Sequence, residues 1–200
     1  TAIIAPYKDD SQVIYKTDPN NTLAGTRVEV VSGGSIAINT RHDMVSPGGG
    51  VDFVGDQLVP IDHVGYHYAV VRGVLRNDQE YVYVVATQNS TNIKVNGVSL
   101  ATINERDVYS ILIPSANLIT TIETNKPVYV YHLSGFYELI DGIHQTQVAG
   151  AIIPTISTCT GSSRVGFNRT KALYTALDIN GNPLPNTPKY YDFYMNILVR

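Results

Sequence analysis

The alternation of apolar and polar positions along this 200-residue chain predicts short β-strands and little helix. The candidate strands are rich in β-branched and aromatic residues, and Gly, Pro and Asn separate them. They are residues 27–31, 34–39, 66–73, 80–87, 92–95, 107–114, 118–124 and 127–133. Residues 172–179 fit either a helix or a strand. We therefore predict an all-β protein.

The pair Asn96–Gly97 gives the clearest turn signal in the chain. A two-residue type I′ turn needs a positive φ at both central positions, and Asn and Gly tolerate that conformation best. We expect a β-hairpin at this pair.

The segment PVYVYHL, residues 127–133, lacks the polar face of a half-exposed strand. Val128 and Val130 fall on one face, while Tyr129 and Tyr131 fall on the other. His132 follows on the valine face. Two interpretations stay open: the strand lies inside a structural module, or it forms the wall of a site that contains His132.

An internal repeat organises much of the sequence, because residues 13–40 align with residues 108–133 at an offset of about ninety residues. The repeat predicts antiparallel β-sandwich units in tandem, with a propeller-like array as the alternative. A partial first unit is expected over residues 1–79, the most complete unit over 80–165, and a further unit or C-terminal strands over 166–200. Asp52, Gln57 and Pro60 recur in step as Asp141, Gln147 and Pro154, and we expect the polar pair in each set to bond to backbone groups.

Composition narrows the possible partners. Fourteen Lys and Arg against 17 Asp and Glu give a net charge of -3 without a basic run, so we expect no nucleic-acid partner. The apolar stretches are too short to insert into a membrane. Cys159, the single cysteine, allows no internal disulfide, and we expect it to be buried. The composition is typical of secreted β proteins, and the strand character of both ends predicts a fragment of a longer protein.

Several segments resemble the N-terminal domain family of IgGFc-binding protein. They are YVVATQNSTNIKVNG (83–97), ERDVYSI (105–111), ITTIETNKPVYVYHLSG (119–135), QVAGAIIPT (147–155) and, more loosely, residues 50–71. The resemblance implies an extracellular module of large surface or mucus-associated proteins. One cysteine and no Trp make the chain similar to disulfide-free bacterial members, so Fc binding is not carried over. The resemblance brings no catalytic residue.

One group of residues has the chemistry of a metal site. His132, Asp141 and His144 offer imidazole and carboxylate ligands that suit zinc or another divalent transition metal. Their spacing matches no known signature, and hydrogen-bonded polar residues at a strand end are the simpler interpretation. Calcium is a second possibility at Asp9 and Asp10, which otherwise begin a turn. We expect no cofactor.

The remaining candidates are surface residues. The segment HDMVSPGGG, residues 42–50, holds His, Asp and Ser without the pattern of a hydrolase, so we expect a surface loop that contacts a partner. Tyrosines on several strands form either an exposed binding surface or cross-strand core pairs. The predicted ligand-binding residues are Arg41, His42, Asp43, Tyr66, Tyr68, His132, Tyr137, Asp141 and His144.

These observations predict a non-catalytic extracellular module of a bacterial surface or secreted adhesin-like protein. Its expected partners are an extracellular protein or glycan and the neighbouring domains of the same polypeptide. The alternative is a carbohydrate-binding or glycan-degrading module. A glycosidase would need two carboxylates facing each other across a groove, drawn from Asp52, Asp56, Glu138 and Asp141.

Overall fold

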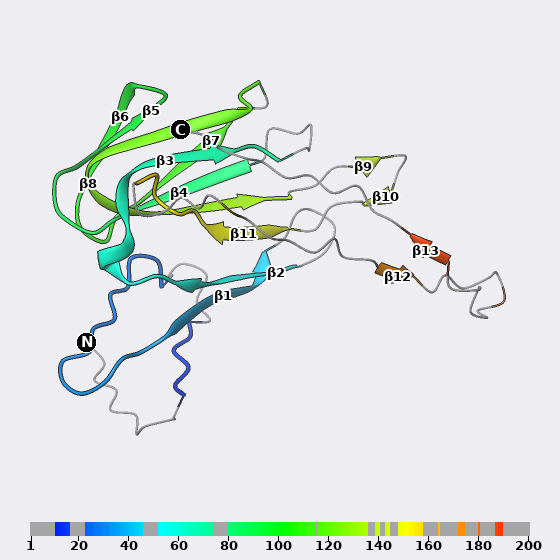
Figure 1. The fold of residues 1–200 in the computed structure, drawn as a ribbon, viewed down its shortest axis with the longest axis horizontal. Helices are drawn as coiled ribbons and strands as arrows, with labels where there is room; N and C mark the ends of the chain where they lie inside the picture. The colour runs from blue at the N-terminus through cyan, green and yellow to red at the C-terminus, as the bar shows by residue number, and fades with distance from the viewer. Residues whose placement is uncertain are drawn as a thin grey trace. The chain divides into compact units, whose positions relative to one another are not determined.

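The computed structural model describes residues 11–16, 23–45, 52–73, 80–114, 116–135, 139–140, 143–144, 148–157, 164, 172–174, 180 and 187–189. Two compact units divide the chain, Thr1–Ser157 and Thr158–Arg200. The regular structure in the described residues is antiparallel β, apart from the 3-10 turn η1 (Ile61–His63), so the predicted all-β fold is confirmed (Figure 1). In the second unit, β12 (Ala172–Tyr174) pairs with β13 (Thr187–Lys189), which makes residues 172–174 a strand.

Seven strands of the first unit form one antiparallel sheet that curls into a half-barrel (Figure 1). They are β3 (Gly65–Val71), β4 (Glu80–Ala86), β5 (Thr91–Val95), β6 (Val98–Ile103), β7 (Val108–Ile113), β8 (Ile119–Ser134) and β11 (Ala149–Ile152). Two smaller pairs accompany it. These are β1 (Ile38–Val45) with β2 (Asp52–Leu58), and β9 (Leu139–Ile140) with β10 (Ile143–His144).

The 16-residue strand β8 is the centre of the sheet because it pairs with four other strands. Its first half lies between β5 and β3, so that Ile122 faces both Val95 and Tyr68. Its second half lies between β4 and β11, so that Tyr131 faces both Tyr83 and Ile152. Two neighbours thus lie along each half of the strand.

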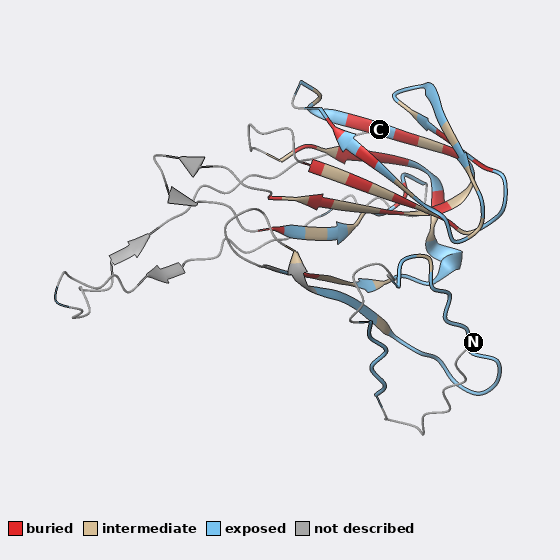
Figure 2. Cartoon of the chain, turned by 180° about the vertical axis from the view of Figure 1, so that it is seen from behind, coloured by how far each residue is buried: buried red, intermediate tan, exposed pale blue. Residues whose placement is uncertain are grey.

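The inner face of the curled sheet holds the main core. Even-numbered residues of β8 point into it, and the buried positions alternate with more exposed ones along the strands (Figure 2). Each fully buried Val or Ile contributes about 1.5–3 kcal/mol relative to an exposed side chain. The buried members are Tyr68, Val70, Val82, Val84, Ile93, Ile111, Ile113, Ile122, Val128 and Val130.

The outer face of β4 and β8 is covered as well, which explains the two apolar faces of PVYVYHL. Val54 on β2 packs with Leu133 and Val148, and Tyr83 and Tyr131 pack against this second cluster. The hydroxyl of Tyr131 occupies the space beside Gly150, where any Cβ would collide with it. The strand therefore lies inside a structural module, as one of the two open interpretations proposed.

Polar bonds fix the β1–β2 hairpin in this position. Oδ2 of Asp56 accepts a hydrogen bond from the backbone N–H of Ile152 at 2.7 Å, and Oδ1 accepts one from the N–H of Gln57 at 2.8 Å. The Tyr129 hydroxyl donates to the carbonyl of Val59 at 2.8 Å. Asp56 thus binds backbone groups at two points, while the side chain of Asp52, for which the repeat predicts such a role, lies outside the described residues.

Most of the predicted strands are present. Residues 66–73, 80–87, 92–95 and 107–114 correspond to β3, β4, β5 and β7. The two predicted strands at 118–124 and 127–133 form the single strand β8. The hairpin at Asn96–Gly97 is confirmed, with φ of 50° and 79° at its two central residues.

Two predicted strands differ from the structure. Residues 27–31 are not in a strand, and the strand predicted at 34–39 begins only at Ile38. Residues 27–31 alternate as a strand does, but their side chains are exposed, and no ladder of backbone bonds pairs them with a described strand. A segment with strand propensity forms a strand only where it is paired with another strand and half-buried. The tandem repeat and its boundaries stay a prediction, and β3, from the predicted first unit, pairs with β8 of the second.

Neighbouring residues of β2 test the packing of the hairpin. Val54 is 5% exposed and Phe53 is 60% exposed. We expect Val54→Ala to lower the free energy of unfolding by about 1–3 kcal/mol, because it removes buried methyl groups. Phe53→Ala, the matched control on the opposite face, should cost less than about 1 kcal/mol. Urea denaturation measures both, and equal losses would contradict the packing.

Candidate functional site

A buried polar cluster surrounds His132, the histidine on the valine face of β8. Its Nε2 lies 2.9 Å from Oε2 of Glu80, the first residue of β4. Glu80 is fully buried. Its two carboxylate oxygens also accept the backbone N–H of Gly73, at 2.9 and 3.1 Å. A Cβ at Gly73 would lie 2.8 Å from Oε1 of Glu80, so the close approach favours glycine.

Arg72 extends this cluster to another strand. Its side chain is buried, and Nη1 donates a hydrogen bond to the carbonyl of Ile113 at 2.8 Å. Arg72 and Gly73 directly follow β3, Glu80 begins β4, Ile113 ends β7, and His132 lies on β8. The cluster therefore ties β3 to the three strands of the other half of the curled sheet.

The electrostatics of the cluster keep Glu80 ionised. Burial raises the pKa of the Glu80 carboxyl, but the opposing contributions are larger in sum. These are the hydrogen bonds from His132 and the Gly73 N–H and the electrostatic interactions with His132 and Arg72. The pKa of Glu80 consequently lies below its ordinary value. A fully buried carboxylate with a lowered pKa is a poor general acid, so the arrangement favours a structural role.

The structure does not test the predicted metal group. His144 is on β10, but its side chain, like Asp141 and Tyr137, lies outside the described residues. The calcium candidates Asp9 and Asp10 also lie outside them. Within the described part of the chain, no three His, Cys, Asp or Glu side chains come together as metal ligands.

The outer face of the β1–β2 hairpin carries an exposed pair of side chains. The guanidinium of Arg41 lies over the ring of Phe53, with Cζ 5.4 Å from the ring centroid. A Cβ at Gly55 would lie 3.1 Å from the Phe53 ring, so the ring rests against the strand there. His42 is exposed beside Arg41, and Asp43 follows in the same strand. Residues 41–45 are thus strand, where a loop was expected.

The tyrosines do not form one exposed surface in the described residues. Tyr66 is 47% exposed, whereas Tyr68 is buried in the core, where its hydroxyl bonds to the backbone of Gly65 and Val128. Tyr81 and Tyr83 stack with their ring centroids 6.3 Å apart. Burial raises the pKa of Tyr68. Tyr68 is therefore a core residue, and Tyr81 and Tyr83 stack on each other along the same strand, β4.

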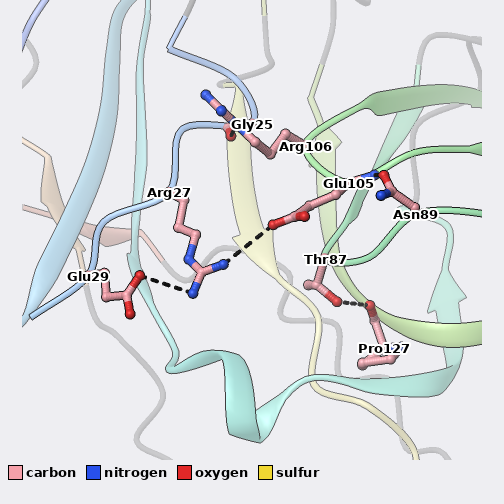
Figure 3. A network of polar contacts seen from close by, with 8 residues as sticks. All are labelled: Gly25, Arg27, Glu29, Thr87, Asn89, Glu105, Arg106 and Pro127. Carbon is pink, nitrogen blue, oxygen red and sulfur yellow. Dashed lines mark hydrogen bonds and ion pairs between the residues drawn. The ribbon is translucent and has the colours of Figure 1, made fainter. Parts of the chain in front are cut away.

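A segment that we call the strap, residues 23–31, lies against the turn between β6 and β7. Figure 3 shows the Arg27 side chain between Glu29 and Glu105, at 3.0 and 3.4 Å from their carboxylates. Arg106 Nε donates to the carbonyl of Gly25 at 3.1 Å. Gly25 has a φ of 73°, and a Cβ there would collide with the Arg106 carbonyl. The sequence gives no signal for contacts between residues 78 positions apart.

A paired substitution tests the cluster. His132→Ala leaves the buried Glu80 carboxylate without one of its donors. We expect it to lower the free energy of unfolding by about 3–5 kcal/mol, as for a broken buried ion pair. In a double-mutant cycle, His132→Ala should lower the free energy of unfolding much less in the Glu80→Gln background than in the original chain. Additive losses would show that the two side chains do not interact.

The lowered pKa of Glu80 also predicts how stability changes with pH. Its contribution is fully present above the unfolded-state pKa of about 4.3 and is lost as pH falls through the lower folded-state pKa. Glu80→Gln should therefore flatten the acid-side fall of unfolding free energy, measured by urea denaturation across pH. Glu105→Gln removes one negative charge from the surface as a control. An unchanged slope in Glu80→Gln would contradict the assignment.

Among the described residues there is no helix with the length and apolar character needed to span a membrane.

Of three comparisons with known proteins, one found a match. No curated protein and no solved structure matched the chain. A family model described as IgGFc binding protein matches residues 10–180, which is most of the sequence and includes every strand of the curled sheet. The chain therefore belongs to the IgGFc-binding protein family.

Proposed function

We propose that this chain is a non-catalytic extracellular module that binds a protein partner, as part of a surface or secreted adhesin-like protein. Family membership over residues 10–180 is the observation that carries the proposal. Immunoglobulin Fc is the ligand named for the family. For this chain we propose the broader class of extracellular proteins, because its single cysteine and lack of Trp set it apart from the mucus-type members.

The packing of the curled sheet supports a binding role on the outside of the module. The inner face of the sheet forms the core, and the tyrosine face of β4 and β8 is covered by the β1–β2 hairpin. Glu80 and Asp56 use their carboxylates in internal bonds. Recognition is then left to exposed side chains on a rigid support, which is how β modules commonly carry binding sites.

The best candidate surface is the outer face of the hairpin. Aromatic residues and Arg are enriched in the residues that dominate the binding energy of protein interfaces. The Phe53 ring is held between Arg41 and the backbone at Gly55, so it loses little conformational entropy on binding. Phe53 is 60% exposed, so a partner can still bury much of its apolar surface.

Two observations weigh against the glycan alternative. A tyrosine platform is not supported, because Tyr68 lies in the core and Tyr81 and Tyr83 are partly buried. Asp56, one of the carboxylates that a glycosidase would need, bonds to the backbone N–H groups of Ile152 and Gln57. Glu138 and Asp141 lie outside the described residues.

The proposal is tested by a binding screen of the full chain against extracellular proteins, with the Fc fragment included. A glycan array is run in parallel, and both are repeated with a chelator to detect dependence on calcium. We expect saturable binding to a protein analyte and no binding to the glycans of the array. Binding to glycans alone, or hydrolysis of an array glycan, would overturn the proposal in favour of the carbohydrate module.

Substitutions on the hairpin locate the surface. We expect Phe53→Ala and Arg41→Ala each to weaken binding to the identified protein by about tenfold or more, since interface residues of this kind commonly contribute over 1.4 kcal/mol. Val98→Ala on β6 is the control, because Val98 is also an exposed apolar residue, at 69% against 60% for Phe53, but lies in another hairpin. Equal affinities for all three variants would place the binding surface elsewhere.

A further inference from the structure

The turn between β5 and β6 combines a reactive sequence with a constrained conformation. Asn96 and Gly97 are its central residues, with φ of 50° and 79°. Both are exposed to solvent. No heavy atom lies within 4 Å of the position that a Cβ would take at Gly97, so water can reach the peptide bond between them.

Hydrogen bonds to Thr121 join Asn96 to β8. The backbone N–H of Asn96 donates to the Thr121 carbonyl at 3.0 Å. In the opposite direction, the Thr121 N–H and hydroxyl both donate to Oδ1 of Asn96, at 2.9 and 3.3 Å. Three hydrogen bonds therefore hold one residue of an exposed turn.

An Asn-Gly pair can modify itself without an enzyme. The backbone nitrogen of Gly97, after losing its proton to water, would attack Cγ of Asn96 and form a C–N bond. The bond from Cγ to Nδ2 then breaks, and ammonia leaves. Water opens the resulting five-membered succinimide ring at either carbonyl, giving aspartate or isoaspartate at position 96. Glycine favours the attack because it has no side chain to obstruct it.

The observed conformation prevents this ring closure. Attack requires the Gly97 nitrogen to lie on the same side of the Cα–C bond as Cβ of Asn96. In the left-handed region Cβ lies close to the residue's own carbonyl oxygen, so the following nitrogen points away from Cβ. Asn96 occupies this region, as the first residue of a type I′ turn does. The turn must open before the reaction can occur.

We propose that Asn96 is a latent deamidation site that the contact with Thr121 keeps closed. Separation of the turn from β8 breaks the three bonds, and Asn96 can then leave the left-handed conformation so that the nitrogen reaches Cγ. The isoaspartate product has one additional methylene in its main chain, so the connection between Val95 and Val98 no longer has the length of a two-residue turn. Deamidation therefore converts a transient opening into a permanent change, independently of what the module binds.

The rate of deamidation in the folded and unfolded chain tests this proposal without any substitution. The full chain is incubated near neutral pH with and without urea, and deamidation at Asn96 is followed by peptide mass spectrometry with an isoaspartate assay. The second Asn-Gly pair, Asn180–Gly181, provides a reference rate in urea. We expect native Asn96 to react about a hundredfold more slowly than in urea, as three bonds must break first. Equal rates at Asn96 in the two conditions would overturn the proposal.

Substitution of Thr121 tests the role of its side chain. Thr121→Ala removes the hydroxyl bond to Oδ1 but keeps the backbone bonds, whereas Thr121→Ser keeps all three. We expect native Thr121→Ala to deamidate at Asn96 several-fold faster than Thr121→Ser. Both variants should react at the same rate in urea, which shows that the difference requires the fold. Equal native rates would show that the Thr121 hydroxyl does not protect Asn96 from deamidation.

Discussion

The pairing of β8 with four other strands is the constraint on which the rest of the first unit depends. A strand with a neighbour on each edge along both halves cannot expose its backbone, and both faces of the second half of β8 are also covered. Pro127 lies within this strand, and it is tolerated because the pairing changes there. Proline lacks an N–H and is normally confined to edges or irregularities. Pro127 lies where β5 gives way to β4 along one edge and where the register of β3 shifts along the other.

Polar side chains replace the ladder at this interruption. Asn125 accepts the N–H of Asn92 through Oδ1 and donates through Nδ2 to the carbonyl of Ser90. The hydroxyl of Thr87 donates to the carbonyl of Pro127 (Figure 3). Buried backbone groups must find partners, so the sequence NKP within an apolar strand marks a change of neighbours, not the end of the strand.

The strands were predictable where local pattern and tertiary position agree. β3, β4, β5 and β7 have the alternating β-branched and aromatic residues of half-buried strands, and Asn96–Gly97 has the residues that its turn requires. β2 and β11 were missed because Gly and Asp interrupt the first and small residues fill the second. Gly150 is needed there only because the Tyr131 ring approaches it, which no local pattern reveals.

The candidate sites show the same limit. The position of His132 on the valine face followed from the period of a strand. Its partner Glu80 is 52 residues away, and the link exists only because β4 and β8 are neighbours. The register of the repeat suggested Asp52 as a residue that bonds to backbone, and its side chain lies outside the described residues. Asp56, which the repeat did not single out, accepts the backbone N–H of Ile152 on β11. Sequence reasoning therefore identified the reactive residue types better than it identified their partners.

The same alternation separates stability from recognition within the hairpin. Along β2, Val54 faces the second cluster, with Leu133 and Val148, and Phe53 faces solvent. On β1, Asn39 and Arg41 are exposed opposite Gln57 and Gly55, on the Phe53 face. Substitutions on this outer face leave the packed face untouched, so a fixed scaffold can present different chemistry. A binding site for a protein ligand is therefore best sought among the exposed residues that do not take part in packing.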